Sequence, residues 1–197
     1  MEYTNNGNLL SYLDENVNKL TWRRKLWYLW EIAMYLSHIH YVGLVHCDLH
    51  AGNILIHNDD APYICDLGLS QSVNSRQQNP TILRGALPFI APEVFYTRKF
   101  TQKSDVYSFG IIMYLIATGE PPFRDRQFDA SLIREIMDGL RPPMPDSAPE
   151  EYKKLAEQCC DADPDKRPRA VTLQRNILKL YNRVDRDNTW DAIYYNV

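Results

Sequence analysis

Several features are scarce or missing in this sequence, and each absence excludes a class of protein. No run approaches the roughly 18 apolar residues that a membrane-spanning helix needs. The start, MEYTNNG, has neither a basic segment nor an apolar core, so it does not resemble a signal peptide. Only four cysteines occur, too few for a disulfide scaffold in a chain of this length. We therefore expect a reduced cytoplasmic or nuclear protein, not secreted and without a transmembrane segment.

An excess of basic residues and internal repetition are also absent. Lys and Arg number 22 against 25 Asp and Glu, a net charge of −3, which argues against a nucleic-acid-binding surface. No repeat or low-complexity tract interrupts the 197 residues. Hydrophobic residues make up 45% and charged residues 24%, which excludes a wholly disordered chain. The length fits one ordinary globular domain.

The spacing of apolar residues predicts a mainly helical chain with a few short strands, in the α+β class. A long helix is expected at 22–41, with Thr21 as its N-cap and Gly43 as its stop. Further helices are expected at 9–13, 103–117, 131–138, 149–160 and 169–181. Short strands are expected at 44–45, 53–56 and 63–65. The helix at 103–117 is apolar nearly all round, so we expect it to be the buried central helix.

The residues that carry chemistry lie in and after the short-strand region. The pieces are HCDLHAGN at 46–53, DLG at 66–68, APE at 91–93, SDVYSFG at 104–110 and DKRP at 165–168. Each piece alone would be an ordinary turn. In this order, they resemble a eukaryotic protein kinase, with most similarity to the tyrosine-kinase-like branch. The resemblance covers residues 1–182 and matches only the larger, C-terminal lobe from the hinge onward, leaving 183–197 as a C-terminal tail.

The resemblance implies a catalytic loop at 46–53 that uses ATP and Mg²⁺. Asp48 would orient the acceptor hydroxyl and accept its proton during phosphoryl transfer. Asn53 and Asp66 would hold Mg²⁺ through hard oxygen ligands. His50 stands where serine/threonine kinases often have the lysine that neutralises the γ-phosphate, which a neutral histidine would do only partly. Leu67 replaces the usual Phe of Asp-Phe-Gly, and we expect it to fill the same apolar slot.

Residues 1–13 resemble the hinge and the helix that follows it, where ATP would bind. The backbone of Glu2 and Thr4 would meet the adenine edge, Asn8 and Ser11 would face the ribose, and Leu55 would lie beneath the adenine. The alternative is that this stretch only caps the helix at 9–13.

The remaining motifs imply a scaffold. His46 would be a packed scaffold histidine, and Asp105 would accept backbone N–H groups of the catalytic loop. Glu93 and Arg167 would form a buried ion pair that ties the activation segment, 66–93, to the lower helices. The hydroxyls in that segment, which are candidate phosphorylation sites, belong to Ser70, Ser72, Ser75 and Thr81.

The sequence also departs from the family pattern. No Gly-rich phosphate loop, strand lysine or partner glutamate is present, which indicates a kinase fragment without the N-lobe. Cys47 replaces an arginine that often binds an activation-loop phosphate, and a packed thiol is favoured over a reactive one. Ala86 replaces a threonine that braces the catalytic aspartate in serine/threonine kinases, which leaves the acceptor hydroxyl open between Ser/Thr and Tyr.

Two functions therefore stand after sequence analysis. The first is a protein kinase in signal transduction that transfers the γ-phosphoryl of ATP to a protein hydroxyl, Ser/Thr ahead of Tyr, with the isolated chain expected to be inactive. Its partners would be nucleotide and a protein substrate. The alternative is a non-catalytic, pseudokinase-like binding module or scaffold. A metal hydrolase built on Asp48, Asp66 and His46 is disfavoured, because His46 is better explained by packing.

Overall fold

The computed structural model describes residues 6–58, 60–73 and 87–187. The helices are α1 (Leu9–Asn16), α2 (Trp22–Tyr41), α3 (Pro92–Thr97), α4 (Gln102–Thr118), α5 (Ala130–Met137), α6 (Glu150–Cys159) and α7 (Ala170–Asp187). The strands are β1 (Leu44–Val45), β2 (Ile54–Ile56), β3 (Pro62–Ile64) and β4 (Gln71–Ser72). Short 3-10 turns occupy Val17–Lys19, Ala51–Asn53, Leu67–Leu69, Leu87–Phe89 and Pro164–Lys166.

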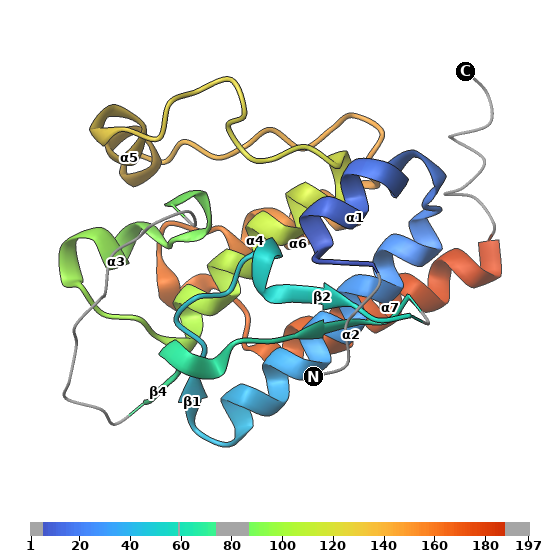
Figure 1. Cartoon of the computed structure of the whole chain (residues 1–197), viewed down its shortest axis with the longest axis horizontal. Helices are drawn as coiled ribbons and strands as arrows, with labels where there is room; N and C mark the ends of the chain where they lie inside the picture. The colour runs from blue at the N-terminus through green and yellow to red at the C-terminus, as the bar shows by residue number, and fades with distance from the viewer. Residues whose placement is uncertain (1–5, 59, 74–86, 188–197) are drawn as a thin grey trace.

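Helix α4 runs through the centre of the molecule (Figure 1). Every residue from Ser104 to Ala117 is buried, as its apolar composition predicts. Its start is fixed by a capping box, in which Thr101 and Ser104 each accept the other's backbone N–H. Its end is fixed by Gly119 in the left-handed conformation. The other elements therefore pack around a helix whose position is defined at both ends.

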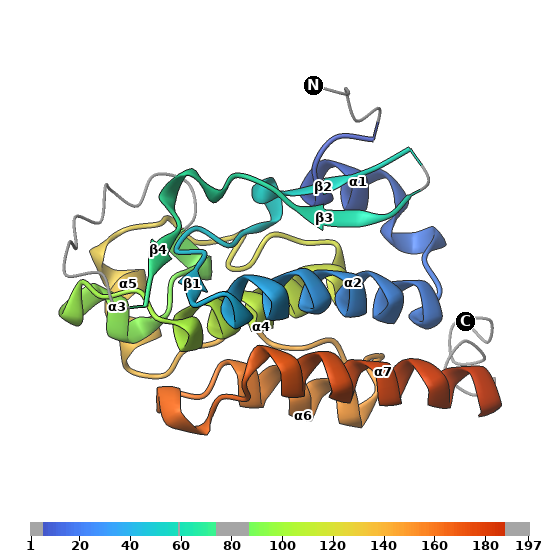
Figure 2. The ribbon, with the colours of Figure 1, turned by 90° about the horizontal axis from the view of Figure 1, so that it is seen from below.

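The elements form layers on either side of α2 and α4 (Figure 2). Helix α7 lies along α2, and α6 lies beside α4. The strands β2 and β3 and helix α1 cover the opposite side. Tyr152 of α6 reaches into the centre, where its hydroxyl donates to the carbonyl of Met113 at 2.6 Å and its ring meets Trp22 edge-on at 5.0 Å.

Two small antiparallel sheets connect the helices to the loops. Strand β2 pairs with β3, with Ile54 opposite Ile64. Strand β1 pairs with β4, with Val45 opposite Gln71. Strands β1 and β2 lie directly before and after the predicted catalytic loop, and β3 and β4 lie on either side of residues 66–68, so both of these loops start from fixed backbone positions.

The predicted helices are all present, and α2 has the predicted bounds. Helix α7 runs on to Asp187, past the predicted end of the kinase-like segment at 182. Helix α3 and strand β4 were not predicted, because six and two residues are too short to show a period. Within the described residues no helix has both the length and the apolar character needed to cross a membrane.

Candidate active site

The loop at 46–53 is anchored from beneath by Asp105, in the first turn of α4. This carboxylate is 1% exposed and accepts the backbone N–H groups of His46 at 2.8 Å and Cys47 at 3.1 Å. Its Oδ2 also lies 2.8 Å from Nε2 of His40. Because a buried carboxylate needs several partners, these bonds fix both the loop and the start of α4. The predicted role of Asp105 as acceptor of loop N–H groups matches this geometry.

His46 is fully buried and both of its ring nitrogens meet the backbone. Nδ1 lies 3.3 Å from the N–H of Asp48, and Nε2 lies 3.3 Å from the carbonyl of Cys65. The pattern assigns the accepting nitrogen to Nδ1 and the N–H to Nε2. His46 therefore braces the loop against the end of β3 and has no free nitrogen for a metal, which removes the hydrolase alternative.

Cys47 is buried where the family often has arginine. Its backbone is left-handed, with φ of 69°, and its thiol lies 3.5 Å from the carbonyl of Val45. Burial, and then the nearby carboxylate of Asp105, raises the pKa of the thiol to about 12. A thiol that stays protonated is a poor nucleophile, which agrees with the predicted packing role.

Asp48 and Asn53, five residues apart, are brought together by the 3-10 turn of the loop. The Asn53 amide donates to the backbone carbonyl of Asp48 at 2.8 Å and to its Oδ2 at 3.1 Å. Both side chains stay partly exposed. The contact with the carboxylate falls on Oδ2, while Oδ1 accepts no hydrogen bond within the described residues.

His50 is the second neighbour of the Asp48 carboxylate. Its Nε2 lies 3.6 Å from Asp48 Oδ2, while its Nδ1 accepts the N–H of Gly52 at 3.0 Å. His50, followed by Asn53 and His46, lowers the pKa of the Asp48 carboxyl, against the opposing effect of burial. Asp48 is therefore an ionised carboxylate at neutral pH.

Asp66 lies beside Asn53 because β2 and β3 pair. The N–H of Cys65 donates to the Asn53 carbonyl at 2.9 Å, which places the next residue, Asp66, at the edge of the loop. Asp66 is exposed and left-handed, with φ of 57°, and its Oδ1 accepts the N–H of Gly68 at 3.1 Å.

These oxygens fit Mg²⁺ as proteins commonly bind it, through one or two carboxylates together with substrate phosphates. Asp66 Oδ2 and Asn53 Oδ1 make no hydrogen bond within the described part of the chain. In that same part, no three His, Cys, Asp or Glu side chains converge into a closed metal cage. The donor set suits a metal that arrives with nucleotide.

The predicted nucleotide edge is partly within the described residues. The Gly7 carbonyl accepts the N–H of Ile56 at 3.0 Å, and Asn8 forms a bridge with Leu55, so this segment runs along β2. The side chains of Asn8 and Ser11 cap α1 together, with Ser11 N–H donating to Asn8 Oδ1 at 3.0 Å. Gly7 has φ of +66°, and a Cβ there would lie 2.8 Å from Ser11 Oγ. The predicted adenine contacts of residues 2 and 4 fall outside the described residues.

The predicted ion pair is present. Arg167 donates to both carboxylate oxygens of Glu93, at 2.7 and 2.8 Å, and its side chain is fully buried. Leu67, expected to fill an apolar slot, is instead 50% exposed, because no described residue covers that edge. In the activation segment Ser70 is half-buried and Ser72 exposed. Residues 75, 81 and 86 lie outside the described residues.

Sequence analysis did not single out two residues that hold the loop. His40 pairs with Asp105, and Gln102 donates through Nε2 to the carbonyls of His40 at 2.8 Å and Leu44 at 3.2 Å. His40 falls on the apolar stripe of the helix at 22–41, where a polar side chain needs a partner. The apolar position of His40 was the feature of the sequence that could have identified it as a residue with a buried partner.

The chain was compared with known proteins. Residues 1–177 match the family described as protein tyrosine and serine/threonine kinase. A protein named as a serine/threonine-protein kinase/receptor in Acanthamoeba polyphaga mimivirus is 32% identical over 187 residues, 93% of this chain and 11% of that protein. The dual specificity protein kinase shkE of Dictyostelium discoideum is 37% identical over 149 residues, 70% of this chain and 20% of that protein.

A third relative is the RGS domain-containing serine/threonine-protein kinase A of Dictyostelium discoideum, 30% identical over 172 residues. The match covers 87% of this chain and 15% of that protein. The chain thus spans between about a tenth and a fifth of the length of these relatives. The family match covers most of the 197 residues, and it includes the loop at 46–53, Asp66 and the Glu93–Arg167 pair. The chain belongs to the protein tyrosine and serine/threonine kinase family.

Proposed function

We propose that this chain is the larger, C-terminal lobe of a kinase that transfers the γ-phosphoryl of ATP to a protein hydroxyl. The observation that carries the proposal is the Asp48 carboxylate, whose Oδ2 is held by Asn53 and whose Oδ1 accepts no hydrogen bond within the described residues. The loop that presents it is anchored to the buried carboxylate of Asp105. A positioned carboxylate is what hydroxyl nucleophiles require in phosphoryl transfer.

Asp48 would act mainly by orientation. Because its pKa is lowered, it is ionised and accepts a hydrogen bond from the substrate hydroxyl. The hydroxyl proton moves to the carboxylate as the oxygen forms its bond to phosphorus and the terminal phosphoryl leaves ADP. His50, beside Asp48, would place a partial positive charge near the phosphoryl group.

Asn53 Oδ1 and Asp66 would hold Mg²⁺, whose charge would offset that of the nucleotide phosphates. The adenine would lie over Leu55, with the backbone of Glu2 and Thr4 at its edge. Asn8 and Ser11 already bond to each other, so either side chain would contact the ribose by exchanging or sharing that bond.

The acceptor is proposed to be Ser/Thr ahead of Tyr, in the tyrosine-kinase-like branch. Two of the relatives above carry serine/threonine-kinase names, and shkE is named dual specificity. A role in signal transduction in the cytoplasm accords with four free thiols, which suit a reducing compartment.

The test is the pair Asp48→Asn and Asp66→Ala in a preparation with measurable phosphoryl transfer, either this chain or one that also carries a Gly-rich loop and a strand lysine. Asp48→Asn should abolish turnover and leave ATP affinity nearly unchanged, because Asp48 contacts the acceptor and not the nucleotide. Asp66→Ala should weaken Mg²⁺-dependent nucleotide binding. Retained turnover in Asp48→Asn would remove it from this role.

The alternative, a non-catalytic binding module, rests on the absence of a Gly-x-Gly-x-x-Gly sequence from these 197 residues. The genomic sequence just upstream distinguishes the two. A Gly-rich strand pair followed by Ala-x-Lys supports the kinase, and its absence together with no ATP binding supports the module.

A further inference from the structure

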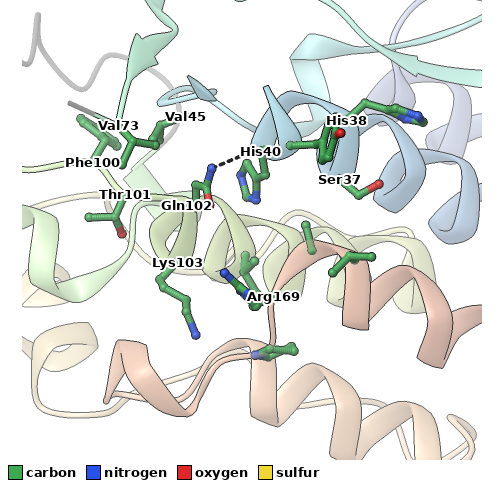
Figure 3. Close-up of a pocket in the computed structure, with 15 residues that line it drawn as sticks. Ser37, His38, His40, Val45, Val73, Phe100, Thr101, Gln102, Lys103 and Arg169 are labelled. Atoms are coloured by element: carbon green, nitrogen blue, oxygen red, sulfur yellow. Dashed lines mark hydrogen bonds between the residues drawn. The ribbon is translucent and has the colours of Figure 1, made fainter. Parts of the chain in front are cut away.

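A cavity lies beside His40, the residue that pairs with Asp105, and Asp48 does not line it. Its volume is about 860 Å³, within the range of sites for small organic molecules. The C-terminus of α2, the N-termini of α4 and α7, and the strand pair β1–β4 enclose it (Figure 3). The nucleotide and acceptor residues named above do not line it.

One end of the cavity is apolar. Val45 of β1, Val73 just after β4 and Phe100 gather there (Figure 3). The rim carries further exposed apolar side chains: Tyr41 is 88% exposed, Val73 57% and Val171 50%. Contiguous exposed apolar surface is uncommon on a monomeric protein and is typical of a binding site.

The other end carries positive charge. Lys103 and Arg169 line it, and no Asp or Glu belongs to the lining, although the chain as a whole has a net charge of −3. The Lys103 ammonium hydrogen-bonds the carbonyls of Asp165 and Arg167, which carry no net charge, so these contacts leave its positive charge without a counter-charge. Arg169 is exposed and, within the described residues, has no carboxylate at ion-pair distance.

We propose that this cavity binds a small amphipathic anion, a monocarboxylate with an extended apolar body. The apolar body would lie against Val45, Val73 and Phe100, and the carboxylate would meet Arg169 and Lys103. A purely inorganic anion would leave the apolar end uncovered, and a neutral lipid would leave the two cations without a counter-charge.

The floor of the cavity is shared with the catalytic loop. His40 and Gln102 line it, and His40 pairs with Asp105, the residue that holds the N–H groups of His46 and Cys47. A ligand that contacts His40 would therefore change the surroundings of those two amides. Their NMR signals are a readout of occupancy that does not depend on kinase activity.

The experiment titrates this 197-residue chain with dodecanoate below its critical micelle concentration, followed by calorimetry and amide NMR. Dodecanol, which has the same body without the charge, and acetate, which has the head without the body, are the comparison ligands. Saturable 1:1 binding of dodecanoate is expected, with shifts at Val45, Val73 and Val171 and at the amides of His46 and Cys47. Dodecanol should bind about tenfold more weakly, and acetate should not saturate.

Two variants separate the ends of the cavity. Arg169→Glu should weaken dodecanoate about tenfold and leave dodecanol unchanged, while the matched charge reversal Arg134→Glu on α5 should change neither. Val171→Asn should weaken both ligands. No binding of dodecanoate, equal binding of dodecanoate and dodecanol, or equal effects of Arg169→Glu and Arg134→Glu would each overturn the proposal.

Discussion

Arg167 and Glu93 join two parts of the chain 74 residues apart through a two-pronged contact. Nη1 and Nη2 of Arg167 donate to the two carboxylate oxygens of Glu93 at 2.7 and 2.8 Å. Arg167 also donates to the carbonyls of Asp161 and Lys103, and its guanidinium lies 5.2 Å from the Tyr107 ring centroid. The pair thereby ties α3 to α4 and to the segment before α7.

We expect Glu93→Gln and Arg167→Met each to destabilise the chain by roughly 3–5 kcal/mol, because each leaves a buried charge without its counter-charge. The double variant should cost less than the two single costs added. Denaturant unfolding of the four proteins gives the coupling. Additivity within about 0.5 kcal/mol would show that the two charges do not act together.

The exposed pair Arg126–Glu135 is a matched control. It has the same two-pronged chemistry, at 2.6 and 3.1 Å, but sits on the surface. Glu135→Gln and Arg126→Met should change the free energy of unfolding far less than the buried substitutions, since water screens the pair. Similar losses at both sites would mean that burial is not the cause.

A second prediction concerns the charge beside Asp48. His50 is the largest contributor to the lowered pKa of the Asp48 carboxyl, so His50→Gln should raise that pKa toward its ordinary value of about 3.9. A carboxyl whose pKa is lowered on folding stabilises the fold at pH values above its unfolded-state pKa, and this stabilisation is lost as the pH falls. His50→Gln should therefore lose less stability on acidification than the wild type. Carbon-detected NMR titration of the carboxyl measures the shift.

His38→Gln is the control for this titration. His38 bonds to the carbonyl of Met34 on α2 and is not among the groups that act on Asp48. It should leave the Asp48 pKa where it is. An unchanged Asp48 pKa in His50→Gln would show that the 3.6 Å contact has no electrostatic effect.

The sequence predicted the parts of the fold that follow from local pattern. The helix at 22–41 has a capping threonine and a helical period, and α4 is apolar on every face, so both were recognised. The exposed state of Leu67 was not predicted, because a motif gives the residue type and not what covers it.

The sequence predicted the motif residues that carry the chemistry, but it did not predict the residues that hold the catalytic loop in place. His40 acts through Asp105, which binds the catalytic loop, and Gln102 acts through the carbonyls of His40 and Leu44 before that loop. Only the tertiary structure brings these groups close. The cavity lined by Lys103 and Arg169 was not predicted for the same reason. Lys103 and Arg169 are 66 positions apart, and neither belongs to a motif of the chemistry.

A third prediction tests the contact between α4 and α6. A Cβ on Gly110 would lie 2.5 Å from Sγ of Cys160 and 2.9 Å from Cβ of Cys159. Overpacking of this kind costs roughly 1–3 kcal/mol, against a helix-propensity gain of about 1 kcal/mol for alanine. We therefore expect Gly110→Ala to destabilise the chain, and to do so less when Cys160→Ala removes the nearest atom. An equal effect in both backgrounds would contradict the proposed clash.

The last prediction concerns Lys25, which is 2% exposed in the core. Its ammonium donates to the carbonyl of Ala117 at 3.0 Å, near the C-terminus of α4, and lies 5.1 Å from the Trp22 ring centroid. Burial lowers the pKa of this lysine from 10.5 to about 8. The cost of burying the charge is therefore present at every pH below about 8.

The sign of the pH effect follows from which state binds more protons. Between pH 8 and 10.5 the unfolded chain keeps the Lys25 proton and the folded chain releases it, so stability rises with pH across that window. Lys25→Met removes this slope. We compare the free energies of unfolding of the wild type and of Lys25→Met. The wild-type value minus the variant value should increase by an amount on the order of 3 kcal/mol between the low-pH and the high-pH end of this window.

Taking the difference between the two proteins cancels the contribution of the cysteines, whose thiols ionise at about pH 8.5 in the unfolded chain and are common to both proteins. Lys154→Met on the surface of α6 is the control, since its side chain is 68% exposed and should add no slope. Urea unfolding at several pH values measures all three proteins. If the difference in free energy of unfolding between the wild type and Lys25→Met does not change with pH, the Ala117 carbonyl and the Trp22 ring keep Lys25 protonated across this window. The buried ammonium would then stabilise the C-terminus of α4.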